Sequence, residues 1–152
     1  MQWRHNIRLQ AALADYWVAR HDGTRAERYA EELLRVATLH RCRKYVAHAH
    51  KIRAEVAAGR GLLDEAEREF QQAGSILQQY PAPLLAWKTY AATARVRVER
   101  GDHVSARQAF DQAAAIINQL AANVDDEQLR QTFLTSSRVR EVLQNTTSNS
   151  QR

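Results

Sequence analysis

The fold of this chain is decided by a pattern that occurs twice, as GLLDEAEREFQQA at residues 61–73 and as GDHVSARQAFDQA at residues 101–113. Each copy begins with a glycine turn and continues into a helix that places an alanine, an aromatic residue and a second alanine on one stripe. The interval from Gly61 to Gly101 is in the range that is typical of stacked helical repeats. The pattern therefore predicts an all-α chain.

Apolar residues at three- and four-residue spacing extend this reading to the whole chain. They predict three antiparallel helix hairpins and a capping helix, at about residues 3–40, 43–80, 83–122 and 125–143. Thr135-Ser136-Ser137 is expected either to bend the capping helix or to split it in two. We expect these elements to form one domain over residues 1–143. Residues 144–152 contain no apolar side chain, which predicts a disordered tail.

Helix ends are marked by residues that suit capping positions. Gly23 is expected to adopt a left-handed conformation at the end of the first helix. Thr24 with Glu27, and Asp125 with Gln128, have the spacing of a capping box and are expected to begin the next helices.

Composition narrows the class of protein. Of the 152 residues, 45% are hydrophobic and 26% are charged, which is ordinary for a soluble globular protein. No stretch is apolar enough for a membrane span, so we expect no membrane partner. Cys42 is the single cysteine, and it cannot form an internal disulfide. This fits a reducing compartment, and we expect a cytoplasmic location.

Positive charge is concentrated in residues 35–60, which we call the basic cluster, although the net charge of the whole chain is only +5. Seven basic residues and one acid, Glu55, lie in this cluster; the basic residues are Arg35, Arg41, Arg43, Lys44, Lys51, Arg53 and Arg60. The cluster indicates a positive patch for an acidic partner. The alternative is a solvated helix surface that binds nothing.

The glycine turn followed by alanine, aromatic residue and alanine resembles the tetratricopeptide repeat (TPR), over about residues 5–122. Trp87, Tyr90 and Ala94 fit the first-helix pattern of that family loosely, whereas Thr93 and Arg97 stand where it usually has large apolar residues. The period of the pattern is also longer than the usual repeat of that family. The end of the chain, residues 113–143, looks like the C-terminal part of large bacterial signalling proteins, in which an ATPase or cyclase module precedes a TPR array.

This resemblance implies a right-handed superhelix of helix hairpins, closed by a C-terminal capping helix. The first helix of each hairpin would line a concave groove that binds a peptide or a helix of a partner protein. Such a module is non-catalytic and needs no cofactor. The groove residues expected on this basis are His48, Lys51, Glu55, Lys88, Arg95 and Glu99. We expect them to hold an acidic peptide in a basic groove; the alternative is an exposed, unused face.

Chemical sites are not indicated by the sequence. We find no glycine-rich phosphate loop, nucleophile elbow or close pair of carboxylates, and therefore expect no enzyme activity. His48 and His50 are two residues apart on a predicted helix and point about 200° away from each other, so they cannot share a metal ion. Cys42 has basic neighbours that would lower its pKa, but nothing else that supports a nucleophile.

The sequence also allows two other kinds of partner, a nucleic acid and a second copy of the chain. The basic cluster could bind nucleic-acid phosphates, with Tyr45 among the charges, but other aromatic residues are sparse and 17 acidic residues oppose it. Trp3, Ile7 and Trp17 could leave an apolar face open on the first helix, which favours a homodimer or further repeats upstream. The alternative is that this helix packs entirely inside its own hairpin.

Overall fold

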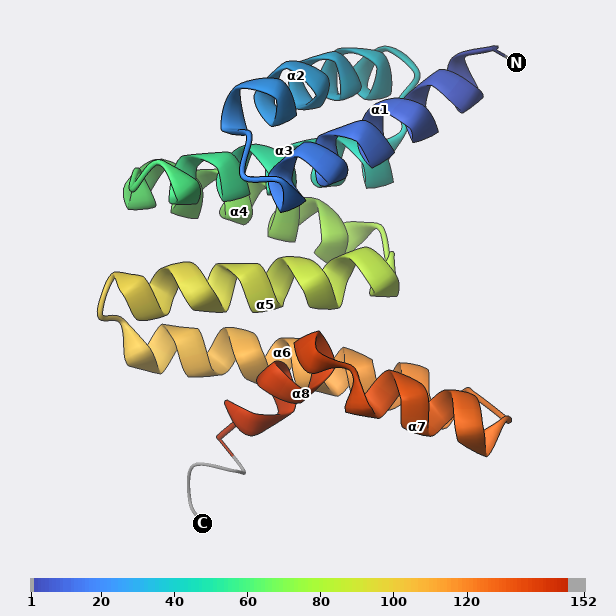
Figure 1. Ribbon diagram of the computed structural model, residues 1–152, viewed down its shortest axis with the longest axis vertical. Helices are drawn as coiled ribbons and strands as arrows, with labels where there is room; N and C mark the ends of the chain where they lie inside the picture. Colours follow the sequence, from blue (N-terminus) through green and yellow to red (C-terminus); the bar gives the residue numbers. More distant parts are fainter. Residues whose placement is uncertain (1, 148–152) are drawn as a thin grey trace. The chain divides into compact units, whose positions relative to one another are not determined.

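The computed structural model describes residues 2–147, and every regular element in that range is a helix (Figure 1). The eight helices are α1 (Gln2–Ala19), α2 (Gly23–Leu39), α3 (Arg43–Gly59), α4 (Leu63–Gln79), α5 (Pro83–Glu99), α6 (His103–Ala122), α7 (Glu127–Thr135) and α8 (Ser137–Gln144). The predicted all-α class is confirmed, whereas the right-handed superhelix stays a prediction.

Four of the turns between helices share one backbone conformation. His21, Arg41, Gly61 and Gly101 have φ angles of 58°, 55°, 76° and 80°. In each turn the following residue donates its N–H to the carbonyl five residues earlier, at 2.8–2.9 Å. This is the Schellman arrangement, which satisfies the last carbonyl groups of a helix. Between His21 and Gly61 this turn follows every helix, at intervals of 20 residues. The glycine pattern in the sequence has twice that interval, because it marks only every second helix.

Gly23 has a different role from the one expected of it. The left-handed residue after α1 is His21, and Gly23 is the first residue of α2. A Cβ atom at Gly23 would lie 3.3 Å from Cγ1 of Val56 on α3. The glycine therefore allows α2 to start close against α3.

Aspartates, and not the expected capping boxes, begin α2 and α7. Asp22 accepts a hydrogen bond from the Arg25 N–H at 3.0 Å, so Thr24 already lies inside the helix and the predicted Thr24–Glu27 box is wrong. Asp126, one residue after the expected Asp125, accepts from the Leu129 N–H at 3.0 Å. Carboxylates are favoured at this position because they satisfy free N–H groups of the first turn.

The chain divides into two compact units, Met1–Ala82 and Pro83–Arg152. The division falls at Pro81-Ala82-Pro83, where α4 ends in an extended Tyr80 because a proline follows. The single domain predicted for residues 1–143 stays a prediction.

Unit 1 contains the first two hairpins, α1–α2 and α3–α4, with α2 and α3 also packed together. Ile7, Leu33 and Ile52 are the large buried side chains of a core that is otherwise rich in alanine. Small side chains let neighbouring helices approach closely. The stripe that the repeated pattern predicted on α4, consisting of Ala66, Phe70 and Ala73, is buried.

Unit 2 contains the α5–α6 hairpin, and α7 and α8 pack on α6. Its core holds Trp87, Phe110, Ile117, Val139 and Val142. The stripe of the second pattern copy on α6 is buried in the same way. Two buried threonines of α5, Thr89 and Thr93, satisfy their hydroxyl groups within the helix by donating to carbonyls four residues earlier at 2.8 Å.

The helix expected at 125–143 is split in two, which is one of the two outcomes expected at Thr135-Ser136-Ser137. Ser136 has extended backbone angles (φ −60°, ψ 144°) and separates α7 from α8. Its hydroxyl donates to the Phe133 carbonyl at 2.8 Å, and the Thr135 hydroxyl donates to the Gln131 carbonyl at 2.6 Å. Such local bonds compete with continued helix.

The expected disordered tail begins too early in the sequence. Gln144 is the last residue of α8, and the Thr147 N–H donates to the Asp111 carboxylate on α6 at 2.8 Å. Residues 148–152, the rest of the predicted tail, lie outside the described range. Among the described helices, none has the length and apolar character needed to cross a membrane.

Candidate functional site

Three of the six predicted groove residues form a row on one face of α3. His48, Lys51 and Glu55 are three and four residues apart, so they lie one above the other along the helix. His48 Nε2 lies 2.9 and 3.0 Å from the two carboxylate oxygens of Asp15 on α1. The Tyr45 ring lies nearly parallel to the His48 ring, with centroids 6.5 Å apart. Contacts with α1 and with its own helix therefore hold this row in place.

Lys51 is only 8% exposed and is neutralised within its own helix. Its Nζ lies 2.9 Å from Glu55 Oε1, in an ion pair four residues apart. The row is thus preorganised, but the positive charge expected of Lys51 is balanced by Glu55. Ion pairs of this kind restrain both side chains to one geometry.

The other three groove residues lie on α5 in unit 2. Lys88 is exposed, with Nζ 5.8 Å from the centroid of the Trp87 ring. Arg95 donates from Nε to Glu141 of α8 at 3.0 Å, so its charge is also balanced. Glu99 is exposed at the last residue of α5. The structure therefore brings each set of three together on its own helix, one set in each unit.

The three residues that were expected to form an open apolar face on α1 point mostly inward; they are Trp3, Ile7 and Trp17. Ile7 is 2% exposed within the core of unit 1, which corrects the expectation that it lies on an open face. Trp17 packs against the same core, with the Arg25 guanidinium 4.3 Å above its ring. Trp3 stacks on the ring of His40 at the end of α2, with centroids 4.2 Å apart. Side chains from α2 therefore cover much of these two indole rings.

A polar cluster between α3 and α4 was not foreseen from the sequence. His50 Nδ1 lies 2.7 Å from one carboxylate oxygen of Glu69, and Arg53 lies 3.3 Å from the other. The predicted opposite directions of His48 and His50 are confirmed, since one contacts α1 and the other α4. Glu69 and Arg53 belong to different helices, so no spacing rule within one helix links them.

The described residues form no grouping suited to metal binding or to thiol catalysis. Within residues 2–147, no three His, Cys, Asp or Glu side chains are grouped so that they could hold a metal ion. Cys42 occupies the N-cap of α3, with Sγ 3.6 Å from the His40 carbonyl oxygen. Its nearest described polar contact is therefore a backbone group and not a catalytic base.

The basic cluster is divided by its ion pairs. Four of its seven members have carboxylate partners, namely Arg35 with Glu32, Lys51 with Glu55, Arg53 with Glu69 and Arg60 with Glu27. Arg41, Arg43 and Lys44 are exposed and form no ion pair with any residue in the described range. The uncompensated charge is thus concentrated at the α2–α3 turn and the start of α3.

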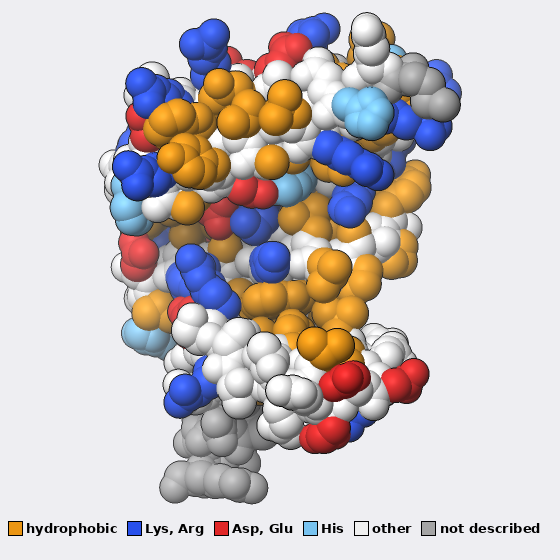
Figure 2. Space-filling model, turned by 45° about the vertical axis from the view of Figure 1, so that its right-hand side comes forward, with side chains coloured by type: hydrophobic (Ala, Val, Ile, Leu, Met, Phe, Trp, Pro, Cys, Tyr) orange, Lys and Arg blue, Asp and Glu red, His pale blue; other side chains and the backbone are white. Residues whose placement is uncertain are grey.

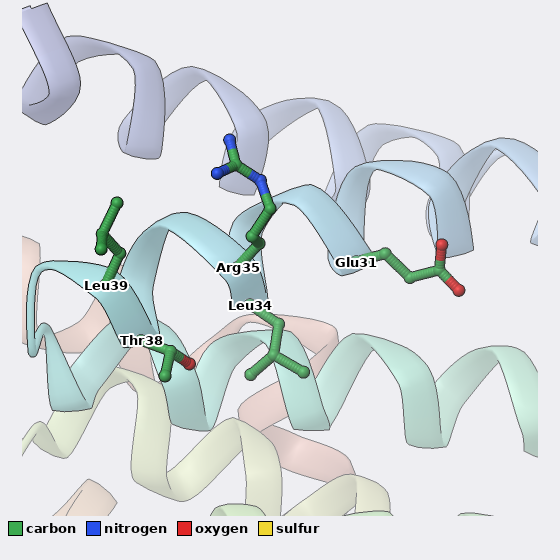
Figure 3. Close-up of a pocket in the computed structure, with 5 residues that line it drawn as sticks. All are labelled: Glu31, Leu34, Arg35, Thr38 and Leu39. Carbon is green, nitrogen blue, oxygen red and sulfur yellow. The ribbon is translucent and has the colours of Figure 1, made fainter.

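A depression of about 520 Å³ lies on the outer face of α2 (Figure 3). Its lining consists of Glu31, Leu34, Arg35, Thr38 and Leu39, all from this one helix. Arg35 donates two hydrogen bonds to Glu32, which holds the pKa of the Glu32 carboxyl below its usual value. One helix cannot surround a ligand, and the polar groups do not converge, so this depression is not a candidate small-molecule site.

Comparison with known proteins identifies no relative: no family model, curated protein or solved structure matches the chain.

Proposed function

We propose that this chain is a non-catalytic protein-interaction module that binds a peptide or a helix of a partner protein. The TPR resemblance motivates the proposal, and so do the helix hairpins with their buried alanine–aromatic–alanine stripes. In this proposal the chain belongs to a larger bacterial regulatory protein of the ATPase or cyclase type. A cytoplasmic location is part of the proposal and rests on the single cysteine.

The observation that carries the proposal is the preorganised row of His48, Lys51 and Glu55 on α3. A largely buried ion pair adds little net stability, because desolvation of both charges offsets their attraction. Stability alone therefore does not account for Lys51 and Glu55 at this place. Side chains already held in one geometry lose less entropy when a partner binds. Recognition explains the row better than folding does.

We propose that the partner segment carries both acidic and basic groups. Lys51 in unit 1 and Arg95 in unit 2 already have carboxylate partners, so the α3 face and the α5 face are each less positive than the sequence indicates. Exposed Lys88 is the groove cation that remains most accessible for an acidic group of the partner.

Exchange of charges within ion pairs tests this function. Lys51→Glu with Glu55→Lys keeps an ion pair on α3 but reverses the order of its charges. The matched control is Glu27→Arg with Arg60→Glu, which exchanges an exposed pair between α2 and α3. We expect capture from nuclease-treated lysate to recover the same protein with the wild type and the control, and to lose it with the exchanged α3 pair and with Lys88→Glu. Recovery of the same protein by all variants would refute the proposed surface.

Self-association is a second candidate, favoured by the outer face of α1. Leu9 and Tyr16 are 57% and 52% exposed and lie seven residues apart, so they share one face of the helix. We propose that this face, rather than Trp3, Ile7 and Trp17, forms the contact of a homodimer. Sedimentation velocity should then show a concentration-dependent dimer that Leu9→Arg abolishes, and a monomer at all concentrations would exclude it.

A further inference from the structure

The charges of unit 1 are segregated along its helices. All ten Asp and Glu residues of the unit lie outside three stretches, residues 1–14, 33–54 and 70–82. Within the described range, these stretches cover the first parts of α1 and α3 and the last parts of α2 and α4. Successive helices of this unit are antiparallel, so all four parts lie at the same end of the unit (Figure 1).

Side-chain contacts confirm that these segments meet. The Trp3 ring, at the start of α1, stacks on His40 at the end of α2, with an angle of 4° between the rings. The Arg43 guanidinium, at the start of α3, lies 5.3 Å from the ring centroid of Tyr80 after α4. Residues distant in sequence therefore form one continuous surface at this end.

Five exposed cations on this surface have no carboxylate partner among the described residues; they are Arg4, Arg8, Arg41, Arg43 and Lys44. We call them, with the rings of Trp3, Tyr45 and Tyr80, the basic end of unit 1. Lys and Arg side chains gather in the upper right part of Figure 2, beside a histidine. Like charges held together without counterions favour the binding of a polyanion.

Aromatic rings alternate with these cations. Arg4 lies 5.4 Å from the Trp3 ring centroid, and Lys44 lies 5.7 Å from that of Tyr45. Tyr80, beside Arg43, is 44% exposed. The sequence shows few aromatic residues near the basic cluster, but the fold adds Trp3 from α1 and Tyr80 from the end of α4.

We propose that the basic end of unit 1 binds single-stranded nucleic acid, a function separate from the protein-binding face proposed above. Guanidinium groups match the geometry of phosphate oxygens, and four of the five free cations are arginines. An exposed ring such as that of Tyr80 can stack on an unpaired base, whereas the bases of a duplex are already stacked on one another. An acidic peptide would use the cations but has no base to place on the rings, so the rings favour nucleic acid.

Fluorescence anisotropy with a labelled 20-nucleotide oligothymidylate tests the proposal on the full chain. The test variant carries Arg41→Gln, Arg43→Gln and Lys44→Gln. The control carries Arg20→Gln, Arg28→Gln and Arg68→Gln, which removes the same charge from exposed positions at the opposite end of unit 1. At low salt we expect the test variant to lose about tenfold or more in affinity, and the control to change by less than about threefold.

A second comparison separates base stacking from charge alone. Tyr80→Leu keeps an apolar side chain but removes the exposed ring, and far-UV circular dichroism checks that each variant is folded. We expect this variant to bind oligothymidylate at least about fivefold more weakly and inorganic polyphosphate equally well.

Four results would overturn the proposal. They are the absence of oligothymidylate binding by the wild type, an equal loss of affinity in the test and control variants, an unchanged affinity in Tyr80→Leu, and tighter binding of a polyglutamate of matched length than of the oligonucleotide. The last result would assign the basic end to an acidic protein segment. Protein capture from nuclease-treated lysate tests the α3 face independently, so either proposal can fail without the other.

Discussion

At the scale of single residues, one turn position is filled in two chemically different ways. Gly61 and Gly101 adopt the left-handed conformation without a steric penalty, but His21 and Arg41 adopt it with a side chain present. Left-handed backbone is uncommon for residues other than glycine. This is why the glycine turns could be predicted from the sequence, whereas the turns at His21 and Arg41 could not be located to the residue.

Alanine substitution at two neighbouring glycines separates backbone strain from packing. Neither Gly59 nor Gly61 has other atoms within 4 Å of the place a Cβ would occupy, but only Gly61 has a positive φ angle. We expect Gly61→Ala to lower the free energy of unfolding by about 1 kcal/mol, because alanine is strained in this conformation. Gly59→Ala, at the end of α3, should be neutral or stabilising. Urea unfolding of both variants measures this, and equal effects would contradict it.

Burial of the Tyr90 side chain is expected to make the free energy of unfolding depend on pH in alkaline solution. Partial burial on α5 raises the pKa of the Tyr90 phenol, because desolvation disfavours the phenolate. The folded state therefore holds this proton more tightly than the unfolded state. The associated stability is present below about pH 10, the ordinary pKa of tyrosine, and is lost as the pH rises further. Absorbance titration of the wild type should show one tyrosine that ionises at higher pH than the others, and this step should be missing in Tyr90→Phe. If the late step persists in Tyr90→Phe, the raised pKa belongs to another tyrosine.

At the scale of elements, the hairpins follow from local patterns but the contacts between them do not. Helical periodicity places His48 and His50 on different faces of α3. The identity of their partners, Asp15 and Glu69, depends on how far α1 and α4 slide along α3. That register is decided by packing of side chains over the whole core, and no spacing within one helix encodes it.

Glu69 is the residue on which the α3–α4 cluster depends. Its side chain is largely buried and contacts both His50 and Arg53. Glu69→Gln keeps the shape but weakens both interactions and leaves buried polar groups poorly satisfied, so we expect a loss of about 1–3 kcal/mol in the free energy of unfolding. Glu31→Gln, on the exposed face of α2, is the matched control and should have little effect. Chemical denaturation that shows equal changes would argue against the cluster.

Arg130 attaches α7 to the end of α6. Helix α7 has no fully buried residue, yet Arg130 donates to the Ala121 carbonyl at 3.0 Å and the Val124 carbonyl at 2.5 Å. Arg130→Met retains the apolar stem and removes both bonds. Hydrogen exchange should therefore accelerate in residues 127–135 and stay unchanged in α5 and α6. Arg138→Met, which alters an exposed arginine of α8, should leave α7 protected; if both variants behave alike, the attachment is not specific.

At the scale of the whole molecule, charge could be predicted in amount but not in arrangement. The basic cluster of residues 35–60 is visible in the sequence, and the partners of Arg35 and Lys51 lie three and four residues away on the same helix. Arg53 and Arg60, in contrast, pair with carboxylates of other helices, which no spacing in the sequence indicates. The predicted groove residues proved to be partly neutralised, Lys51 by Glu55 of the same helix and Arg95 by Glu141 of α8. Tyr45 is visible within the basic cluster, but the other two rings of the basic end could not be foreseen, because Trp3 and Tyr80 join it only through the fold.

The basic end should reduce the stability of the protein when no ligand is bound. Arg43 and Lys44 occupy the first turn of α3, which contains no acidic residue, and its N-cap Cys42 forms no side-chain capping bond. Cations at a helix N-terminus oppose the helix dipole by about 0.3–1 kcal/mol each at low salt. Arg43→Gln with Lys44→Gln should therefore raise the free energy of unfolding at low salt, and the gain should disappear at about 1 M salt, where charges are screened within about 3 Å. Urea titrations at both salt concentrations measure this. A gain that persists in high salt would point to altered helix propensity, and a loss at low salt would mean that these cations stabilise the fold and need no ligand to explain them.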